Sequence, residues 1–324
     1  MSETGGSAGQ GGSTGSGGAA GSGGMSGTAG VAGPAGAGRS GAGGSSGSGG
    51  SAGTAGAGGN VGGKGCGNAS LPAPCNTEAA GMCTVNVAGA NREYFLALPA
   101  NYNTNTAYPL VFAFHGATHY ARELLDSGRS QTDRGFFRIR ENFPDAIYVA
   151  PQGLVGDPGG VTGWPDTNGR DVAFTRAMIA SFESTYCVNS SKIFSTGASF
   201  GGMMTNLLAC QMPEVFRAMA PMLGSLNARN CGTHPIAAWI EHGDADMTVN
   251  ISGGIGARDH FIQRNGCSTT NTQSAAMSDG ITTCTIYNQC TAGNYPVVWC
   301  AVPGMGHRLA NWTGTEIAKF FRQF

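Results

Sequence analysis

The sequence has few charged side chains of either sign. Lysine and arginine total 18 and aspartate and glutamate total 19 in 324 residues, so the formal net charge is −1. A protein that binds nucleic acid or an anionic membrane surface needs a basic face, and this composition does not supply one. We therefore expect no nucleic-acid partner.

Long hydrophobic runs are also missing. No apolar stretch reaches the roughly 18 residues that a transmembrane helix needs, so we expect no membrane span. The first residues, Met1-Ser2-Glu3-Thr4, lead into glycine and serine without the apolar core of a secretory signal.

The ten cysteines include no C-x-x-C pair, which is the spacing typical of zinc sites and redox motifs. An even count permits five disulfides, and disulfides persist in oxidising compartments. We expect a secreted or cell-surface-tethered protein whose export segment was removed before residue 1. We expect no cofactor.

Residues 1–65 are mostly glycine, serine, alanine and threonine. Such a segment cannot bury enough apolar surface to offset its conformational entropy. We predict a disordered linker or tether over 1–65 and one esterase domain over 66–324, for the reasons given below.

Short apolar runs alternate with helical patterns after residue 83. Two runs, 84–87 and 93–98, flank a turn and predict a hairpin. Five later runs have the apolar character of strands buried on both faces of a parallel sheet: 108–115, 146–150, 192–196, 236–241 and 297–302. Helices are predicted over 171–186 with Asp171 as its cap, and over 200–211, 256–265 and 315–324. The alternation predicts an α/β fold with a mostly parallel sheet, whose ligands bind beyond the carboxyl ends of the strands.

The pentapeptide Gly197-Ala198-Ser199-Phe200-Gly201 has the pattern G-x-S-x-G between an apolar run and a potential helix. This is the setting of a nucleophile elbow, a sharp turn between strand and helix that exposes a serine hydroxyl. The pattern also occurs by chance in the glycine-rich segment, but without apolar flanks there. Side chains at Gly197 and Gly201 would collide with nearby backbone in such a turn. We predict Ser199 as a nucleophile.

A serine nucleophile needs a base, and the base needs a carboxylate that holds its tautomer. In an α/β-hydrolase these residues follow in the order Ser, acid, His. His307 is the histidine that follows every candidate acid, on a loop after the last predicted strand. His234 precedes a strand, His242 is expected to build the turn after its strand, and His260 lies within a helix.

Two carboxylates, Asp244 and Asp246, follow the strand 236–241. Asp244 stands beside a glycine and is typical of a turn residue. Asp246 lies further into the loop and can turn back toward His307, so we predict Asp246 as the acid, with a solvated loop carboxylate as the alternative for either residue.

The segment 115–119, H-G-A-T-H, follows a strand and is expected to provide part of an oxyanion hole. The backbone N–H groups of Phe200 and Ala117 are the predicted donors, with Thr118 as the alternative to Ala117 and as a substrate contact. His115 and His119 have the i, i+4 spacing of metal ligands, but that spacing brings side chains together only on a helix. We therefore expect no metal.

Trp164 lies in a loop rich in glycine and proline between two predicted strands. An exposed tryptophan at the rim above Ser199 would form a flat platform for an aromatic acyl group. The alternative is that Trp164 anchors its own loop.

Four motifs from about residue 83 to 324 resemble carbohydrate esterase family 1, which includes feruloyl esterases and polyhydroxybutyrate-depolymerase-like esterases of the α/β-hydrolase superfamily. They are F-H-G-A-T at 114–118, W-P-D-T-N-G-R-D-V-A-F at 164–174, T-G-A-S-F-G-G-M-M at 196–204 and H-G-D-A-D-M-T-V at 242–249. The resemblance implies Ser199, Asp246 and His307 as the triad. Related depolymerases often carry H-G-C where this chain has His115-Gly116-Ala117, and a Trp-Pro soon after the histidine where this chain has Arg308 and Leu309. These differences favour the feruloyl esterases.

The combined interpretation is a secreted serine carboxylesterase that removes ester groups, most of all feruloyl groups, from plant cell-wall polysaccharide. Polyhydroxyalkanoate depolymerase and acetyl-xylan esterase are the alternative enzymes. A catalytically silent binding domain is the alternative of another class, and the presence of nucleophile, acid and base argues against it.

Overall fold

The computed structural model describes residues 63–128, 131–156 and 160–324. Most of the predicted tether, residues 1–62, lies outside the described residues. Its last part is bound to the folded domain, because Gly63 donates its N–H to Val188 O at 2.8 Å and Gly65 donates to Glu183 O at 2.8 Å. Residues 63–65 thus pack with the chain that follows them.

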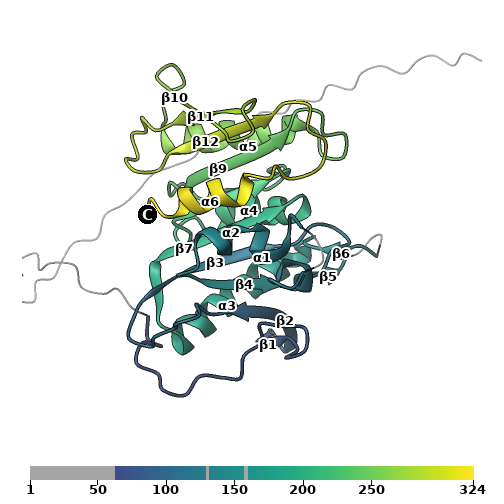
Figure 1. Ribbon diagram of the computed structural model, residues 1–324, viewed down its shortest axis with the longest axis vertical. Helices are drawn as coiled ribbons and strands as arrows, with labels where there is room; N and C mark the ends of the chain where they lie inside the picture. The colour runs from purple at the N-terminus through teal and green to yellow at the C-terminus, as the bar shows by residue number, and fades with distance from the viewer. Residues whose placement is uncertain (1–62, 129–130, 157–159) are drawn as a thin grey trace, which may run out of the picture. The chain divides into compact units, whose positions relative to one another are not determined.

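One ten-stranded sheet forms the centre of the described chain (Figure 1), in the order β1-β2-β4-β3-β7-β8-β9-β12-β11-β10. The six strands from β4 to β12 in this order are parallel to one another. At the two edges the pairs are antiparallel: β1 with β2, β2 with β4, β12 with β11 and β11 with β10. The strands are β1 Cys83–Val87, β2 Ala90–Ala97, β3 Tyr108–Phe114, β4 Ile147–Pro151, β7 Val188–Ala198, β8 Ala218–Met222, β9 Ala237–Gly243, β10 Gln273–Ala276, β11 Thr283–Tyr287 and β12 Val297–Val302. A separate small hairpin pairs β5 Leu154–Val155 with β6 Thr162–Gly163.

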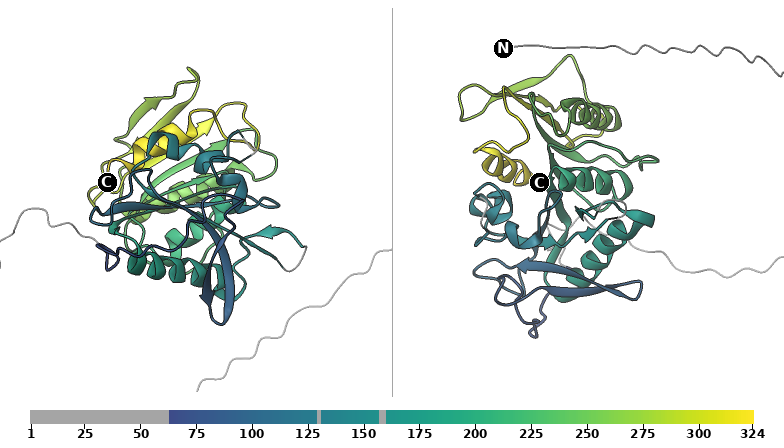
Figure 2. Two further views of the ribbon diagram at one scale, coloured as in Figure 1. Left: turned by 60° about the horizontal axis from the view of Figure 1, so that its bottom comes forward. Right: turned by 90° about the vertical axis from the view of Figure 1, so that its right-hand side faces the viewer.

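Helices cover both faces of the sheet (Figure 2). The longer helices α3 Arg170–Thr185, α4 Phe200–Gln211 and α5 Ile251–Asn265 lie on one face, and α1 Arg134–Phe137, α2 Ile139–Asn142 and α6 Thr313–Phe321 on the other. Two 3₁₀ turns, η1 Ala121–Leu124 and η2 Thr167–Gly169, lie in the connections. This arrangement confirms the predicted α/β-hydrolase fold.

The strand β3 shows why its sequence is continuously apolar. Leu110, Phe112 and Phe114 pack in the core under α3, α4 and α5, while Val111 and Ala113 pack in the core on the opposite face. All five side chains are fully buried. A central strand covered on both faces has no solvent side, so it shows no alternation of polar and apolar residues.

The predicted hairpin and all five predicted strands are present, but β8 escaped the sequence-based prediction. Its sequence A-M-A-P-M is short and contains Pro221, which cannot donate a ladder hydrogen bond and argues against a central strand. The strand nevertheless lies fully buried between β7 and β9. Its neighbours supply the pairing that its own sequence does not signal.

The prediction that Asp171 caps α3 is wrong. Asp171 lies inside the first turn, fully buried, and its carboxylate pairs with Arg92 at 2.9 Å. The capping contacts come from Asp166, whose Oδ1 accepts the N–H groups of Asp171 at 2.8 Å and Val172 at 3.0 Å. Asp171 can face inward because Arg92 provides the cationic partner that a buried carboxylate needs.

All ten cysteines lie in the described residues and form five disulfides, which confirms the interpretation of the even cysteine count. The pairs are Cys66–Cys187, Cys75–Cys83, Cys210–Cys231, Cys267–Cys290 and Cys284–Cys300. Within the described residues, no helix is long and apolar enough to cross a membrane.

Candidate active site

Ser199 lies at the turn between β7 and α4, with φ 57° and ψ −117°. This strained backbone conformation is the sharp turn that the G-x-S-x-G pattern predicts. A Cβ on Gly197 would press on the backbone of Gly201, and one on Gly201 would collide with Phe114 O. The two glycines are therefore required by the close approach of three backbone segments.

His307 lies on the loop that follows β12 and contacts Asp246 on the loop that follows β9. The distance between His307 Nδ1 and Asp246 Oδ2 is 2.7 Å. The His307 side chain is 23% exposed, whereas that of Asp246 is fully buried. The carboxylate thus holds the imidazole at Nδ1 and leaves Nε2 free of this contact.

Asp246 is surrounded by hydrogen-bond donors. Its Oδ1 accepts the N–H groups of Thr248 at 2.8 Å and Val249 at 3.0 Å, in addition to the His307 contact at Oδ2. Desolvation by burial raises the pKa of Asp246, but the hydrogen bonds from His307, Val249 and Thr248 outweigh it and hold the pKa below its ordinary value. The group is therefore held as a carboxylate.

The other candidate acid and base residues lie elsewhere. Asp244 is exposed and accepts the N–H of Gly304 at 2.6 Å, as expected of a turn residue. His242 is buried beside the turn after β9, where its Nε2 lies 2.7 Å from Val249 O. His260 lies within α5, and His234 is exposed ahead of β9.

Ser199 and His307 line the same cavity, which has a volume of about 430 Å³. Its lining includes Gly116 and Ala117 at the end of β3. Apolar walls come from four side chains on separate segments, Leu124, Phe137, Leu223 and Leu309. The cavity opens at the carboxyl ends of the parallel strands, where the topology predicts a ligand site.

Of the predicted oxyanion donors, one already has a hydrogen-bond acceptor and two do not. The N–H of Thr118 already donates to Thr162 O at 3.0 Å, which removes Thr118 as the alternative donor. In the described part of the chain, the N–H groups of Ala117 and Phe200 form no hydrogen bond. Phe200 is the first residue of α4, so its N–H also carries the positive end of the helix dipole.

His115 has a structural role beside this loop. Its Nε2 accepts the N–H of Gly153 at 3.0 Å, so the ring hydrogen sits on Nδ1, which contacts Gly116 O at 2.8 Å. Desolvation by burial lowers the pKa of His115 to about 4. Both nitrogens of the neutral ring are occupied, and neither is left to bind a metal.

The prediction that Trp164 forms an exposed substrate platform is wrong. Trp164 is 3% exposed, lies in the core against the edge of Phe114, and donates its Nε1–H to His115 O at 2.9 Å. Trp164 therefore anchors its own loop to the end of β3, which was the alternative. Thr118 also falls outside the lining of the cavity, and its hydroxyl donates to Ala117 O. The predicted substrate contact of Thr118 gains no support from this position.

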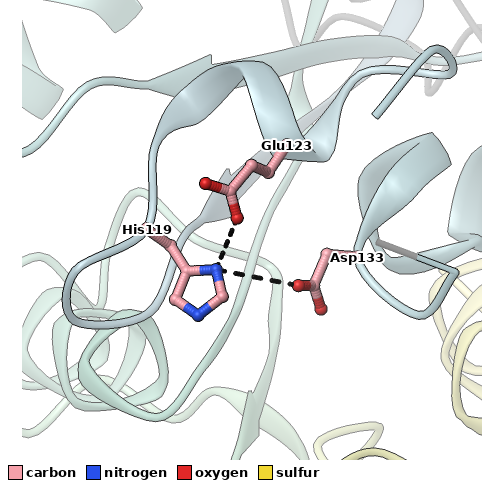
Figure 3. Close-up of side chains that lie close together, drawn as sticks. All are labelled: His119, Glu123 and Asp133. Carbon is pink, nitrogen blue, oxygen red and sulfur yellow. Dashed lines mark hydrogen bonds and ion pairs between the residues drawn. The ribbon is translucent and has the colours of Figure 1, made fainter. Parts of the chain in front are cut away.

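A polar group at the cavity wall was missed by the sequence reasoning (Figure 3). His119 Nδ1 lies 2.5 Å from Glu123 Oε2 and 4.0 Å from Asp133 Oδ2. The ligand atoms of the three side chains lie within 4.8 Å of one another and could hold a metal ion. The hydrogen bond between His119 and Glu123 accounts for the arrangement without an ion, so the absence of a metal stays a prediction. The i, i+4 spacing of His119 and Glu123 was the available signal.

This sheet, with a serine at the turn after a central parallel strand, is the arrangement of the α/β-hydrolases. The model of the prolyl oligopeptidase family matches residues 162–251. The acetyl xylan esterase from Aspergillus awamori has the same fold, with a TM-score of 0.55 and 17% identity over 74% of this chain and 98% of that chain.

Two curated fungal proteins are more similar in sequence. Feruloyl esterase D of Neurospora crassa is 33% identical over 223 residues, which are 67% of this chain and 74% of that protein. Feruloyl esterase C of Emericella nidulans is 32% identical over 217 residues, 67% of this chain and 76% of that protein. The chain belongs to the feruloyl esterase family and is a serine carboxylic ester hydrolase.

Proposed function

We propose that the protein hydrolyses feruloyl esters that decorate plant cell-wall polysaccharide. The observation that carries the substrate class is the 33% identity to feruloyl esterase D over two thirds of this chain. Acetyl and polyester substrates are the alternatives that the sequence left open.

Ser199 is the nucleophile in this proposal, His307 the base and Asp246 the acid. Ser199 Oγ attacks the ester carbonyl carbon while His307 takes its proton, and the protonated His307 then gives that proton to the departing alcohol oxygen. Water then attacks the acyl carbon while His307 takes its proton; the bond from that carbon to Ser199 Oγ breaks, and His307 returns the proton to Ser199 Oγ as the free acid leaves. The 2.7 Å contact with Asp246 supports this route because it keeps the Nδ1–H in place and stabilises the imidazolium.

The N–H groups of Phe200 and Ala117 are proposed to bind the oxyanion of the tetrahedral intermediates. Their lack of acceptors within the described residues supports the assignment, because a donor that is already aimed and unpaired needs no reorganisation. The position of Ala117 in the cavity lining beside Ser199 supports it further.

The acyl group is proposed to lie among the apolar walls of the cavity. Leu124, Phe137, Leu223 and Leu309 come from separate segments and offer a hydrophobic site for a flat phenyl ring. The volume of about 430 Å³ lies in the range of small-molecule sites. This placement replaces the Trp164 platform.

A substrate panel tests the proposal. Purified protein is assayed with methyl ferulate, acetylated xylan and polyhydroxybutyrate, and Ser199→Ala serves as the control. We expect the highest kcat/KM on methyl ferulate and a loss in kcat on the order of 10⁴-fold in Ser199→Ala. A preference for acetylated xylan or the polyester would overturn the substrate class. A variant that keeps more than about a tenth of the activity would overturn the nucleophile.

We also propose that the protein is secreted or tethered at the cell surface, where its polysaccharide substrate lies. Five disulfides support this location, because they persist in oxidising compartments. Thiol titration of unfolded, unreduced protein from its natural source should detect close to no free thiol. Detection of nearly all the cysteines as thiols would contradict the location.

A further inference from the structure

A second imidazole lies against the carboxylate of Asp246. His242 is the penultimate residue of β9, and its side chain is fully buried. Its Nε2 lies 2.7 Å from Val249 O and 3.4 Å from Asp246 Oδ2. Both contacts are made by the same ring nitrogen.

These contacts determine the tautomer of His242. A carbonyl and a carboxylate oxygen can only accept hydrogen bonds, so Nε2 carries the hydrogen, which it donates to Val249 O and brings near Asp246 Oδ2. The other nitrogen, Nδ1, is buried and forms no hydrogen bond within the described residues. A second hydrogen on Nδ1 would be buried without an acceptor, which is costly.

The packing around the ring prevents it from turning. A Cβ added to Gly254 of α5 would lie 2.7 Å from His242 Nδ1 and 3.1 Å from Trp299 Cη2. The glycine thus leaves just enough space for the imidazole between α5 and the sheet. The direction of the Nε2–H bond is therefore set by the fold.

We propose that His242 is a positioning residue for the catalytic pair of Asp246 and His307, an inference that rests on the proposed triad. Its N–H ties the turn 246–249 to β9 through Val249 O, and it lies near the oxygen of Asp246 that faces His307. The carboxylate accepts three hydrogen bonds, from Thr248, Val249 and His307, and the N–H of His242 lies 3.4 Å from the oxygen that His307 contacts.

The three hydrogen bonds leave Asp246 one orientation, and the nearby N–H of His242 moderates the pull of Asp246 on the His307 proton. Other charged groups on the packed elements are engaged elsewhere. Asp244 binds the N–H of Gly304, and Arg258 of α5 lies over the Trp299 ring and pairs with Asp259. The His242 hydrogen is thus the specific contact to remove.

Three variants separate positioning from packing. In His242→Gln the amide nitrogen can take the place of Nε2 and keep the donor. In His242→Asn the amide reaches only the Nδ1 position, and in His242→Leu no donor remains. His260→Leu is the matched control, because it removes a half-buried imidazole with an unpaired nitrogen on α5 that does not touch Asp246.

The readout is the pH profile of kcat and kcat/KM together with the melting temperature. The substrate is p-nitrophenyl acetate, a generic activated ester, so an error in the feruloyl assignment leaves the test intact. Loss of the donor makes Asp246 attract the His307 proton more strongly, so the acid limb should move to higher pH by about 0.5 to 1 unit. We expect kcat to fall about 10-fold in the Asn and Leu variants with KM nearly unchanged.

His242→Gln should keep the acid limb of the parent enzyme and most of its kcat, and His260→Leu should keep both. If His242→Leu fails to fold, the comparison of Asn with Gln decides. A lower melting temperature with an unmoved acid limb in His242→Asn would reduce His242 to a packing residue and overturn the inference. If Ser199→Ala loses all activity but every His242 variant keeps the pH profile of the parent, the inference about His242 is overturned and the triad stands.

Discussion

At the scale of single residues, the two aspartates after β9 offer a matched comparison. Asp246→Asn keeps the size of the side chain but presents an amide to His307, which favours the wrong imidazole tautomer. We expect kcat to fall roughly 10⁴-fold. Asp244→Asn should cost far less, because the exposed Asp244 side chain contacts the N–H of Gly304 and, among the described residues, not His307. The measurement is steady-state kinetics on methyl ferulate, and the opposite ranking would move the acid to Asp244.

Trp164 allows a second test at this scale. Its indole N–H holds His115 O, and its ring fills space beside Phe114, so it supports the loop that carries Ala117. Trp164→Ala should therefore lower kcat/KM by similar factors on methyl ferulate and on a short acetate ester, and lower the melting temperature. A loss confined to the ferulate would instead restore the aromatic platform, which gains about 0.5 to 1.5 kcal/mol from stacking.

At the scale of elements, Glu241 joins β9 to the start of α6. Its buried carboxyl oxygens lie 2.7 and 2.9 Å from Thr313 Oγ1, and Oε1 lies 3.4 Å from the N–H of Ala310, three residues after His307. Desolvation by burial raises the pKa of Glu241 to about 7, against the opposing hydrogen bonds from Thr313 and Ala310. The loop of His307 is thus fastened to a carboxyl group that stays protonated in mildly acidic solution.

The raised pKa predicts a pH-dependent stability. Between the ordinary pKa of a glutamate and about pH 7, the unfolded chain releases the proton of Glu241 while the folded protein keeps it. The contribution of Glu241 to the unfolding free energy is therefore largest at low pH. It falls as the pH rises through that window and is constant above it. The glutamine in Glu241→Gln cannot titrate. Between about pH 4.5 and about pH 8, the unfolding free energy of the parent should therefore fall by about 3 kcal/mol relative to that of the variant. Urea unfolding at several pH values measures it, and a difference that does not change with pH would refute the prediction.

At the scale of the whole molecule, the five disulfides close loops of very different length. Cys66 and Cys187 are separated by 121 residues, whereas Cys75 and Cys83 are separated by 8. Chain entropy predicts that the first bridge stabilises the fold by about 5 kcal/mol and the second by about 2.5 kcal/mol. Replacing each pair by two serines and measuring urea unfolding should reveal this order. Equal losses of unfolding free energy for the two bridges would contradict the dependence on loop length.

Much of the fold could be predicted because its patterns are local. The buried strands β3 and β12 are continuous apolar runs, β7 and β9 contain shorter apolar runs, and each of the four is followed by a helix signal or a glycine loop. The strand β8 and the turn α1 could not be predicted in this way. Residues 135–137 of α1 and Arg138 after it have positive φ values. Phenylalanine and arginine rarely adopt such a left-handed turn, so only the surrounding packing holds them there.

The sequence by itself determined the class of the protein and the place of Ser199, because a glycine-flanked turn between a strand and a helix is specified by neighbouring residues. Only the tertiary structure decided what depends on residues far apart in the chain. Asp246 meets His307 across 61 residues, and Trp164 is buried because its N–H finds His115 O across 49 residues. Residue type and local spacing report the conformation of a segment, but the direction of a side chain depends on which distant backbone its neighbours bring within hydrogen-bond reach.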